Sequence, residues 1–216
     1  MTEASLRITE VFYSLQGEAL TAGLPTVFIR LTGCPLRCGY CDSEYAFFGG
    51  ERRSIASLLE ETAGFSPRYV CVTGGEPLAQ PNCLPLLSAL CDAGFDVSLE
   101  TSGALDISGV DARVSVVMDL KTPGSGELDK NRWENIALLK PSDQVKFVIT
   151  DYADFQWASF TTAQHELPGK VAAVWFSPSF TQVNPRELAQ WILRDRLPVR
   201  FQLQLHKQLW GEVPGV

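Results

Sequence analysis

Short runs rich in β-branched and aromatic residues alternate with amphipathic stretches along most of the chain. The runs that predict strands cover residues 7–12, 26–31, 68–73, 96–101, 114–119, 144–149, 172–177 and 199–205. The stretches that predict helices cover residues 54–62, 82–94, 152–166 and 184–195. This alternation favours an α/β fold, in which helices pack outside a parallel sheet. It constrains the fold more than any other feature of the sequence.

The number of predicted strands fits either an open sheet or a partial (β/α) barrel. In both architectures the functional loops follow the carboxyl ends of the strands. Here five such loops carry polar or glycine-rich sequences: a cysteine cluster after 26–31, GGEP after 68–73, SG after 96–101, KTP after 114–119 and SPS after 172–177. With no internal repeat or linker in view, we expect a single domain over residues 1–216 and one site at this edge of its sheet.

The charge balance and the cysteine content limit the class of protein. Asp and Glu number 25 against 18 Lys and Arg, a net charge of -7, which argues against a nucleic-acid-binding surface. The first residues lack the pattern of a signal peptide, and no apolar run approaches the roughly 20 residues that span a membrane. We therefore expect a cytoplasmic protein, whose six cysteines are reduced and available as metal or catalytic ligands.

Three of the cysteines lie within eight residues. Cys34, Cys38 and Cys41 have the spacing C-x3-C-x2-C on a loop with glycine and proline. A structural zinc site needs four ligands, but there is no second cysteine pair, and His165 and His206 are distant in the sequence. An iron–sulfur cube held by three cysteines keeps one iron open to an external ligand. The cluster therefore favours an iron–sulfur site, with zinc or no metal as the alternatives.

The motif CPLRCGYC, with aromatic Tyr40 before the last cysteine, resembles the signature of the radical S-adenosylmethionine (SAM) enzymes. The resemblance implies a partial (β/α) barrel and a [4Fe-4S] cluster on Cys34, Cys38 and Cys41. In that superfamily the open iron binds the amino and carboxylate groups of SAM, and electron transfer cleaves SAM to a 5′-deoxyadenosyl radical. The glycine-rich VTGGEP at 72–77 is similar to a second element of these enzymes.

Further segments point to one family within this superfamily. YSLQGE (13–18), GLPTVFIRLTGC (23–34), LETSG (99–103), VMDLKTPGSGE (117–127) and RFQLQLHK (200–207) resemble the 7-carboxy-7-deazaguanine synthase family, from about residue 8 to about residue 210. The resemblance implies a lyase that converts 6-carboxy-5,6,7,8-tetrahydropterin into 7-carboxy-7-deazaguanine with loss of ammonia, in queuosine and related 7-deazapurine biosynthesis.

The strand 26–31 suggests where the substrate lies. Its alternation places Val27, Ile29 and Leu31 on one face and Arg30 on the other. An arginine inside a strand needs an anion, and its forked guanidinium suits a carboxylate. Arg30 either pairs with a neighbouring acidic residue or, as the resemblance implies, binds the substrate carboxylate.

Six more residues are expected at the substrate, the first five from the resemblance: Leu15, Gln16, Gly17, Glu18, Thr101 and His206. The first four would hydrogen-bond the edge of the pterin, although Glu18 fits an exposed turn as well. Gln204 and His206 are expected to alternate inward on the predicted strand 199–205. There His206 either contacts the substrate or is a hydrogen-bonded histidine without a chemical role.

A magnesium site is implied directly after the cysteines. Asp42 and Ser43 carry oxygen donors, which suit the hard Mg2+ ion. The magnesium itself rests on the resemblance, and the alternative for Asp42 is a helix N-cap.

The resemblance implies a set of cofactor contacts spread over the loops: Tyr40, Cys41, Asp42, Gly74, Gly75, Glu76, Gly103, Lys121, Ser177, Pro178, Ser179 and Phe180. In this set Glu76 would offer its carboxylate to the ammonium group of SAM. Lys121 would meet the SAM carboxylate, unless it is a surface lysine beside Glu127.

The resemblance also implies a homodimer and an electron donor such as flavodoxin or ferredoxin, with a small pterin as substrate and neither nucleic acid nor a membrane as partner. Two other classes remain open from the residues. One is another small radical SAM enzyme, such as an activase that installs a glycyl radical in a partner protein. The other is a zinc-binding interaction module without enzymatic activity. The tail GEVPGV has no pattern that assigns it a role.

Overall fold

The computed structural model describes residues 4–180, 182–211, 213 and 215. Its strands are β1 (Ser5–Leu15), β2 (Pro25–Leu31), β3 (Glu51–Ser54), β4 (Tyr69–Gly74), β5 (Asp96–Thr101), β6 (Ser115–Asp119), β7 (Gln144–Ile149), β8 (Ala173–Pro178) and β9 (Arg200–Phe201). Its α-helices are α1 (Ile55–Gly64), α2 (Cys83–Asp92), α3 (Tyr152–Gln164), α4 (Leu167–Lys170), α5 (Pro185–Asp195) and α6 (Leu205–Trp210). Short 3-10 helices are η1 (Glu44–Ala46), η2 (Pro77–Ala79), η3 (Pro123–Ser125), η4 (Leu128–Lys130) and η5 (Trp133–Leu138).

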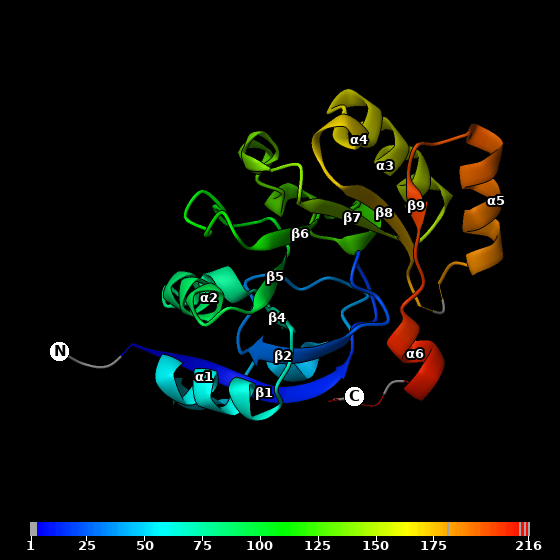
Figure 1. Ribbon diagram of the computed structural model, residues 1–216. Coiled ribbons are helices and arrows are strands. Elements are labelled where there is room, and N and C mark those ends of the chain that lie inside the picture. The colour runs from blue at the N-terminus through cyan, green and yellow to red at the C-terminus, as the bar shows by residue number, and fades with distance from the viewer. Residues whose placement is uncertain (1–3, 181, 212, 214, 216) are drawn as a thin grey trace.

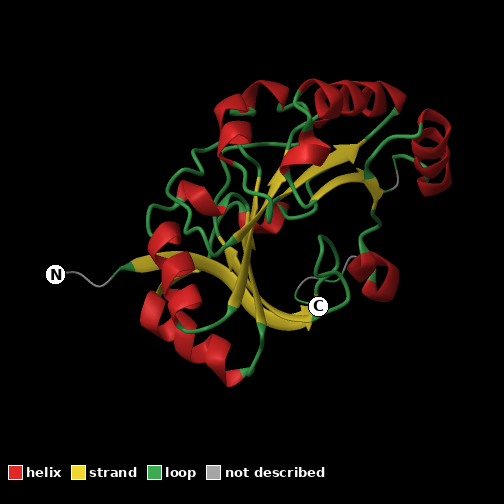
Figure 2. Cartoon of the chain, turned by 45° about the horizontal axis from the view of Figure 1, so that its top comes forward, coloured by secondary structure: helices red, strands yellow, loops and turns green. Residues whose placement is uncertain are grey.

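All of these strands belong to one sheet with the order β3-β1-β2-β4-β5-β6-β7-β8-β9. From β2 to β9 every neighbouring pair is parallel, as predicted. At the other end β1 runs antiparallel to both β2 and β3, a feature that the sequence did not predict. The sheet curves without pairing β3 to β9, and helices α1 to α5 lie on its convex side (Figures 1 and 2). The expected partial barrel is confirmed.

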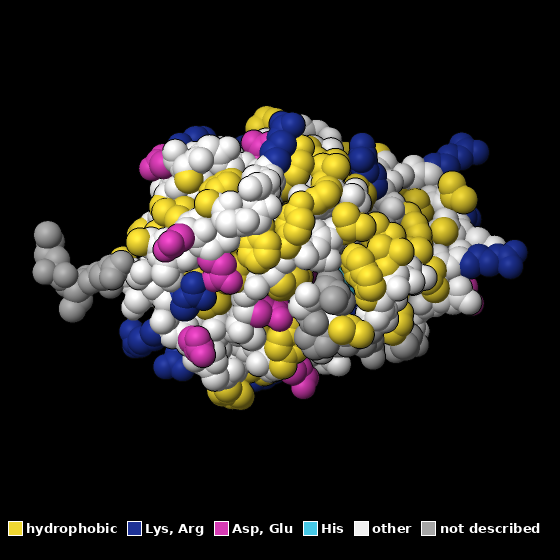
Figure 3. Space-filling model, turned by 60° about the horizontal axis from the view of Figure 1, so that its bottom comes forward, with side chains coloured by type: hydrophobic (Ala, Val, Ile, Leu, Met, Phe, Trp, Pro, Cys, Tyr) yellow, Lys and Arg dark blue, Asp and Glu magenta, His cyan; other side chains and the backbone are white. Residues whose placement is uncertain are grey.

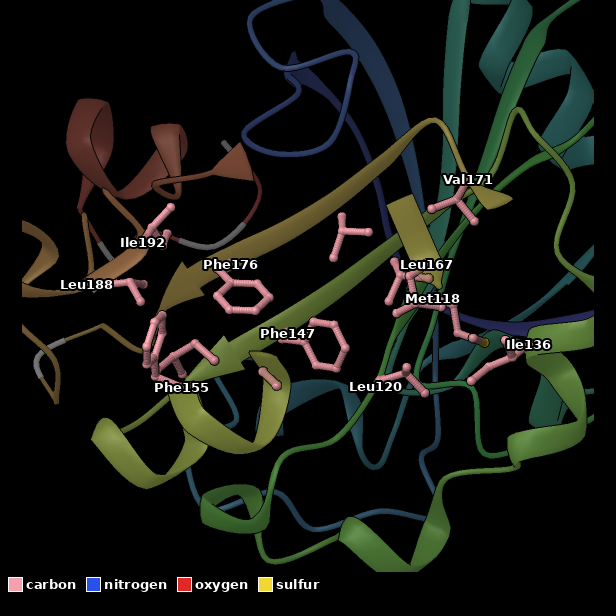
Figure 4. Close-up of a cluster of buried hydrophobic side chains, with 14 of the residues drawn as sticks. Met118, Leu120, Ile136, Phe147, Phe155, Leu167, Val171, Phe176, Leu188 and Ile192 are labelled. Atoms are coloured by element: carbon pink, nitrogen blue, oxygen red, sulfur yellow. The ribbon is translucent and has the colours of Figure 1, made fainter. Parts of the chain in front are cut away.

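Two hydrophobic clusters hold the helices to the sheet. One joins β2, β4 and β5 to α1 and α2, and in it Val27, Ile29 and Leu31 are fully buried, as their predicted shared face requires. The other joins β6, β7 and β8 to α3 and α5 around Phe147 and Phe176 (Figure 4). The convex face is therefore apolar, and the polar positions of the same strands alternate onto the concave face.

The structure corrects the prediction for the end of the chain. The strand expected at 199–205 is reduced to β9, and His206 lies on helix α6 rather than alternating inward on a strand. The backbone leaves the sheet because Leu205 donates its N–H to the carbonyl of Gly17, 3.0 Å away, instead of to a neighbouring strand. In the tail, residues 212, 214 and 216 lie outside the described residues. Among the residues that the structure describes, no helix combines the length and apolar character needed to cross a membrane.

Candidate active site

The concave face of the sheet carries polar and charged side chains. Arg30 on β2 is in register with Thr73 on β4, and Asp119 on β6 is in register with Lys146 on β7. In a parallel sheet, residues in register lie on the same face. The concave face is thus lined with charges at the carboxyl ends of the strands, where the predicted loops begin.

The cysteine loop follows β2 directly. Cys34, Cys38 and Cys41 are all partly exposed. Burial raises the pKa of each thiol, that of Cys38 to about 11. The three thiols are therefore protonated at neutral pH when nothing is bound, and binding a metal or cluster would release protons.

The loops converge through backbone hydrogen bonds. The N–H of Glu76, in the GGEP loop, donates to the carbonyl of Gly33 at 2.8 Å, and the N–H of Gly39 donates to Ser125 at 3.0 Å. The N–H of Ser102, after β5, donates to the Glu76 carboxylate at 2.7 Å. Four of the five predicted loops are therefore joined at the same edge of the sheet.

The donor set of the cysteine loop fits an iron–sulfur cube better than a single ion. Within the described part of the chain, no three His, Cys, Asp or Glu side chains meet closely enough to hold one metal ion. In a cube each cysteine binds a different iron, so the three sulfurs need not converge on one point.

Three buried polar atoms, one in the cysteine loop and two on the concave face of the sheet, are free to bind a polar cofactor. The hydroxyls of Tyr40 and Ser177 and one carboxylate oxygen of Asp119 have no hydrogen-bond partner among the described residues. An unpaired buried polar group costs about 1–3 kcal/mol, which a bound polar cofactor would offset. Tyr40 and Ser177 belong to the set that the resemblance assigns to SAM.

The two glycines of the GGEP loop allow close packing against the cysteine loop. A Cβ atom on Gly75 would lie 2.7 Å from the Cβ of Cys34, and one on Gly74 would lie 2.9 Å from the backbone nitrogen of Leu31. Both distances are too short for a side chain. Glycine is thus required here to bring the two loops together.

Glu76 has a structural role that sequence reasoning missed. Its side chain is fully buried, and its carboxylate accepts hydrogen bonds from the N–H of Leu78, the hydroxyl of Thr101, and both the N–H and the hydroxyl of Ser102. The contacts of Glu76 with the SAM ammonium and of Thr101 with the substrate stay predictions, and the structure adds that the Thr101 hydroxyl donates to Glu76 at 2.9 Å. These two side chains satisfy each other and join the β4 and β5 loops.

Lys121 is buried and not a surface lysine beside Glu127, so that alternative is wrong. Its ammonium donates to Asp119 at 2.9 Å and lies 5.7 Å from the centre of the Tyr40 ring. Burial lowers the pKa of Lys121, but Asp119 and Tyr40 outweigh it, and the net shift is upward. A permanent positive charge therefore lies beside the cysteine loop.

Gly103 follows the same edge of the sheet. Its φ of +70° suits glycine, and a Cβ there would lie 2.8 Å from the side chain of Met118. The backbone can therefore approach β6 closely.

Arg30 makes the pair with an acidic neighbour that the sequence left open. Its Nε donates to Glu10 on β1 at 2.6 Å, and its guanidinium lies 5.8 Å from the ring of Phe12 and 5.7 Å from that of Tyr45. Only Nε takes part in this pair. No hydrogen bond from its two Nη atoms is found within the described residues, so they remain able to bind an anion.

Glu18 is held by a lysine that sequence reasoning missed. It forms an ion pair with Lys146, and Gln204 donates to its other oxygen at 3.0 Å. Both charged side chains are only about 15% exposed, so the alternative of an exposed turn is wrong. Burial raises the pKa of Glu18, but Lys146 outweighs it, and the net shift is downward. A lysine within the apolar run QVKFVI was the available signal.

The remaining residues of the LQGE segment lie beside Glu18. Leu15 ends β1, and buried Gln16 donates to Glu100 at 3.3 Å and accepts from the N–H of Glu18. A Cβ on Gly17 would lie 2.9 Å from the ring of His206. The structure thus brings His206 to the predicted substrate segment, although from a helix.

Asp42 and Ser43 also differ from expectation. Ser43, not Asp42, precedes η1, and it makes no side-chain capping bond, so the N-cap alternative for Asp42 is wrong. The carboxylate of Asp42 accepts from Ser43 at 3.0 Å and pairs with Lys207 of α6 at 3.0 Å. Burial raises the pKa of Asp42, but Lys207 outweighs it and holds that pKa well below its usual range.

The loop after β8 closes one side of the site. Ser177 and Pro178 end the strand and are buried, and the Ser179 hydroxyl donates to Gln182 at 2.6 Å. Phe180 is 40% exposed, and the ammonium of Lys207 lies 5.0 Å from its ring. Helix α6 thus contacts this loop, the LQGE segment and the residues after Cys41.

Comparisons with known proteins identify the family. The Radical SAM superfamily model matches residues 28–121. The 7-carboxy-7-deazaguanine synthase of Chlorobaculum tepidum is 47% identical over 213 residues, covering 97% of this chain and 96% of that protein. The enzyme of the same name from Koribacter versatilis is 43% identical, covering 98% of this chain and all of that protein.

A solved structure supports the fold. The crystal structure of QueE from Escherichia coli superposes with a TM-score of 0.70 at 24% identity, covering 94% of this chain and 95% of that one. The similarity to the relatives from Chlorobaculum tepidum and Koribacter versatilis covers nearly the whole chain. This chain belongs to the 7-carboxy-7-deazaguanine synthase family of the radical SAM superfamily.

Proposed function

We propose that the protein converts 6-carboxy-5,6,7,8-tetrahydropterin into 7-carboxy-7-deazaguanine with loss of ammonia. The observation that carries the proposal is the position of the three cysteines, at the edge of a concave face that presents Arg30 and the Glu18–Lys146 pair. A [4Fe-4S] cluster held by these cysteines would bind SAM and would supply the radical that removes a hydrogen atom from C6 of the pterin.

The chain's own residues orient the substrate. The free side of the Arg30 guanidinium provides two parallel N–H donors for the pterin carboxylate. Glu18, kept ionised by Lys146, accepts hydrogen bonds from the amino and ring N–H groups of the pterin, and Gln16 and the Gly17 backbone flank it. His206 covers Gly17 and excludes water from that side.

Other residues hold the cofactor. Tyr40 and Ser177 have unpaired buried hydroxyls, and Lys121 offers a buried positive charge for the SAM carboxylate. Cys41 and Asp42 would present backbone to the adenine, and the backbone of Gly103, after β5, would line the path of the ribose. Gly75 holds the GGEP loop against the cysteine loop. Ser43 retains a hydroxyl for magnesium.

The reaction also needs a one-electron donor, for which a flavodoxin or ferredoxin is proposed, and a homodimer is proposed as the assembly. Hydrophobic side chains gather on the face that Figure 3 turns forward. Strand β1 and helix α6, at the bottom of Figure 1, carry the exposed Tyr13, Leu209 and Trp210, which are 45%, 52% and 38% exposed. Such surface suits a protein contact.

The test is anaerobic turnover of the iron-reconstituted protein with SAM, Mg2+, a strong reductant and the pterin, followed by mass spectrometry. We expect 7-carboxy-7-deazaguanine from the wild type and none from Cys38→Ala. A brown protein that cleaves SAM but leaves the pterin intact would retain the radical chemistry and contradict the substrate. Installation of a glycyl radical in a partner protein would favour an activase instead.

A further inference from the structure

Helix α6 is held over the candidate site by contacts with the LQGE segment and with the residues after Cys41. The N–H of Leu205 donates to Gly17 at 3.0 Å. The side-chain amide of Gln204 donates to Glu18 at 3.0 Å and to Asp42 at 3.3 Å. The first turn of α6 is therefore positioned by groups that belong to the site itself.

Lys207 completes this attachment with a buried charge. Its side chain is only 8% exposed, although it lies on a short helix near the chain end. Its ammonium lies 3.0 Å from Asp42 Oδ2 and 5.0 Å from the centre of the Phe180 ring. A lysine this buried needs a counter-ion, and Asp42 is the carboxylate that the structure gives it.

The Lys207–Asp42 ion pair engages a carboxylate that the family resemblance implies as a magnesium ligand. Asp42 Oδ2 accepts from both Lys207 and Gln204, and Oδ1 accepts from the hydroxyl of Ser43. A divalent cation on this carboxylate would replace these donors and lie within a few ångströms of a second positive charge. The side chain of Asp42 is 43% exposed, so these donors, and not burial, stand between the carboxylate and a metal ion.

We propose that Lys207 is the resident cation of Asp42, and that docking of α6 and binding of a divalent metal at Asp42 exclude each other. In the docked state the ammonium holds the carboxylate and keeps the helix over Gly17 and Glu18. Metal binding at Asp42 then requires that Lys207 withdraw, which releases the first turn of α6. Lys207 is in this respect a positioning residue. The inference goes beyond the proposed reaction and does not depend on the pterin.

The test measures Mn2+ binding to the cluster-reconstituted protein, without SAM or pterin, from the electron paramagnetic resonance signal of free Mn2+. The Mn2+ bound through Asp42 is the difference between the Mn2+ bound by each protein and by its Asp42→Asn counterpart. This subtraction removes binding at unrelated acidic sites of the chain. Lys207→Met removes the ammonium, and Lys207→Arg keeps a positive charge. Lys170→Met, an exposed lysine on α4, is the matched control.

Over the Mn2+ concentrations that fill the site of Lys207→Met, we expect the isotherms of the wild type, Lys207→Arg and Lys170→Met to coincide with those of their Asp42→Asn counterparts. Lys207→Met should gain one Asp42-dependent site. This site should bind Mn2+ at least about ten-fold more tightly than Asp42 of the wild type does. A wild-type protein with an Asp42-dependent site as tight as that of Lys207→Met would overturn the proposal, and this outcome does not require that any Lys207 variant fold.

Hydrogen exchange of the α6 amides supplies a second readout. In the wild type, Mn2+ high enough to occupy Asp42 should speed exchange over residues 205–210, whereas Asp42→Asn should exchange fast with or without metal. Occupied Asp42 with unchanged protection of α6 would show that the two events are compatible and refute mutual exclusion. Because SAM cleavage and pterin turnover are not read, failure of this proposal stays distinct from failure of the proposed reaction.

Discussion

The replacement Lys146→Met tests the ion pair on the concave face of the barrel. It leaves the Glu18 carboxylate about 14% exposed, with Gln204 at 3.0 Å as its remaining side-chain donor. Removing one partner of a buried ion pair costs about 3–5 kcal/mol. Because both side chains retain some exposure and the Gln204 bond persists, we expect the free energy of unfolding to fall by about 3 kcal/mol.

The double variant Glu18→Gln with Lys146→Met isolates the cause. It removes the uncompensated charge, so most of the loss should be recovered, leaving a deficit of about 1 kcal/mol. A deficit in the double variant equal to that of Lys146→Met alone would mean that the lysine stabilises through packing and not through its charge.

The pH dependence of the contribution that Glu18 makes to the free energy of unfolding should reverse in Lys146→Met. In the wild type the pKa of Glu18 is lowered from 4.5. Its contribution to stability is therefore present above that pH and is lost as the pH falls through the folded-state pKa. In Lys146→Met burial remains and raises the pKa of Glu18, so the folded chain binds the extra proton. The penalty then grows as the pH rises, by up to about 1.4 kcal/mol per unit.

The assay is anaerobic urea unfolding of the reconstituted proteins between about pH 4 and pH 7, followed by tryptophan fluorescence. We expect the deficit of Lys146→Met to be larger at neutral than at acidic pH. A variant within about 0.5 kcal/mol of the wild type across this range would refute the assignment of a buried, interacting pair.

Three further substitutions test the site and the core. Gly75→Ala, whose Cβ would meet the cysteine loop at 2.7 Å, should cost about 1–3 kcal/mol and lower the iron bound per chain. Gly39→Ala, in the same loop with open space, should bind iron like the wild type, and equal iron in both would contradict the packing role. Phe155→Ala, 1% exposed, should lower the stability by about 3–5 kcal/mol in thermal unfolding, against about 0.5 kcal/mol or less for Phe160→Ala, 66% exposed on the same helix. Similar melting temperatures would argue against the core described. Arg30→Lys should raise KM for the pterin at least about ten-fold while leaving SAM cleavage unchanged, and an unchanged KM would remove Arg30 from the substrate site.

Local sequence patterns predicted most of the sheet and the helices on its convex side. The period-two alternation of Val27, Ile29 and Leu31 correctly indicated a buried face. Every second side chain of a strand points to the same side of the sheet, so the pattern can be read from the sequence of the strand alone. The antiparallel pairing of β1 and β3 was missed, since the side of the sheet on which an edge strand adds leaves no local signature.

The end of the chain was predicted wrongly for a similar reason. VRFQLQL alternates like a strand, but its last residues bond to the LQGE segment nearly two hundred positions away. A contact over such a distance overrides the local preference. The pairing of Glu18 with Lys146 and of Asp42 with Lys207 also joins distant parts of the chain, so the charged residues could be seen in the sequence but their partners could not.

The measurement that tests the central claim most directly is the transfer of deuterium from the substrate. The pterin deuterated at C6 is incubated anaerobically with the reconstituted protein, SAM and a reductant. The deuterium content of the 5′-deoxyadenosine formed is then measured by mass spectrometry. If the concave face holds the pterin against the radical, the 5′-deoxyadenosine gains deuterium as 7-carboxy-7-deazaguanine accumulates. Unlabelled 5′-deoxyadenosine together with intact pterin would contradict the account.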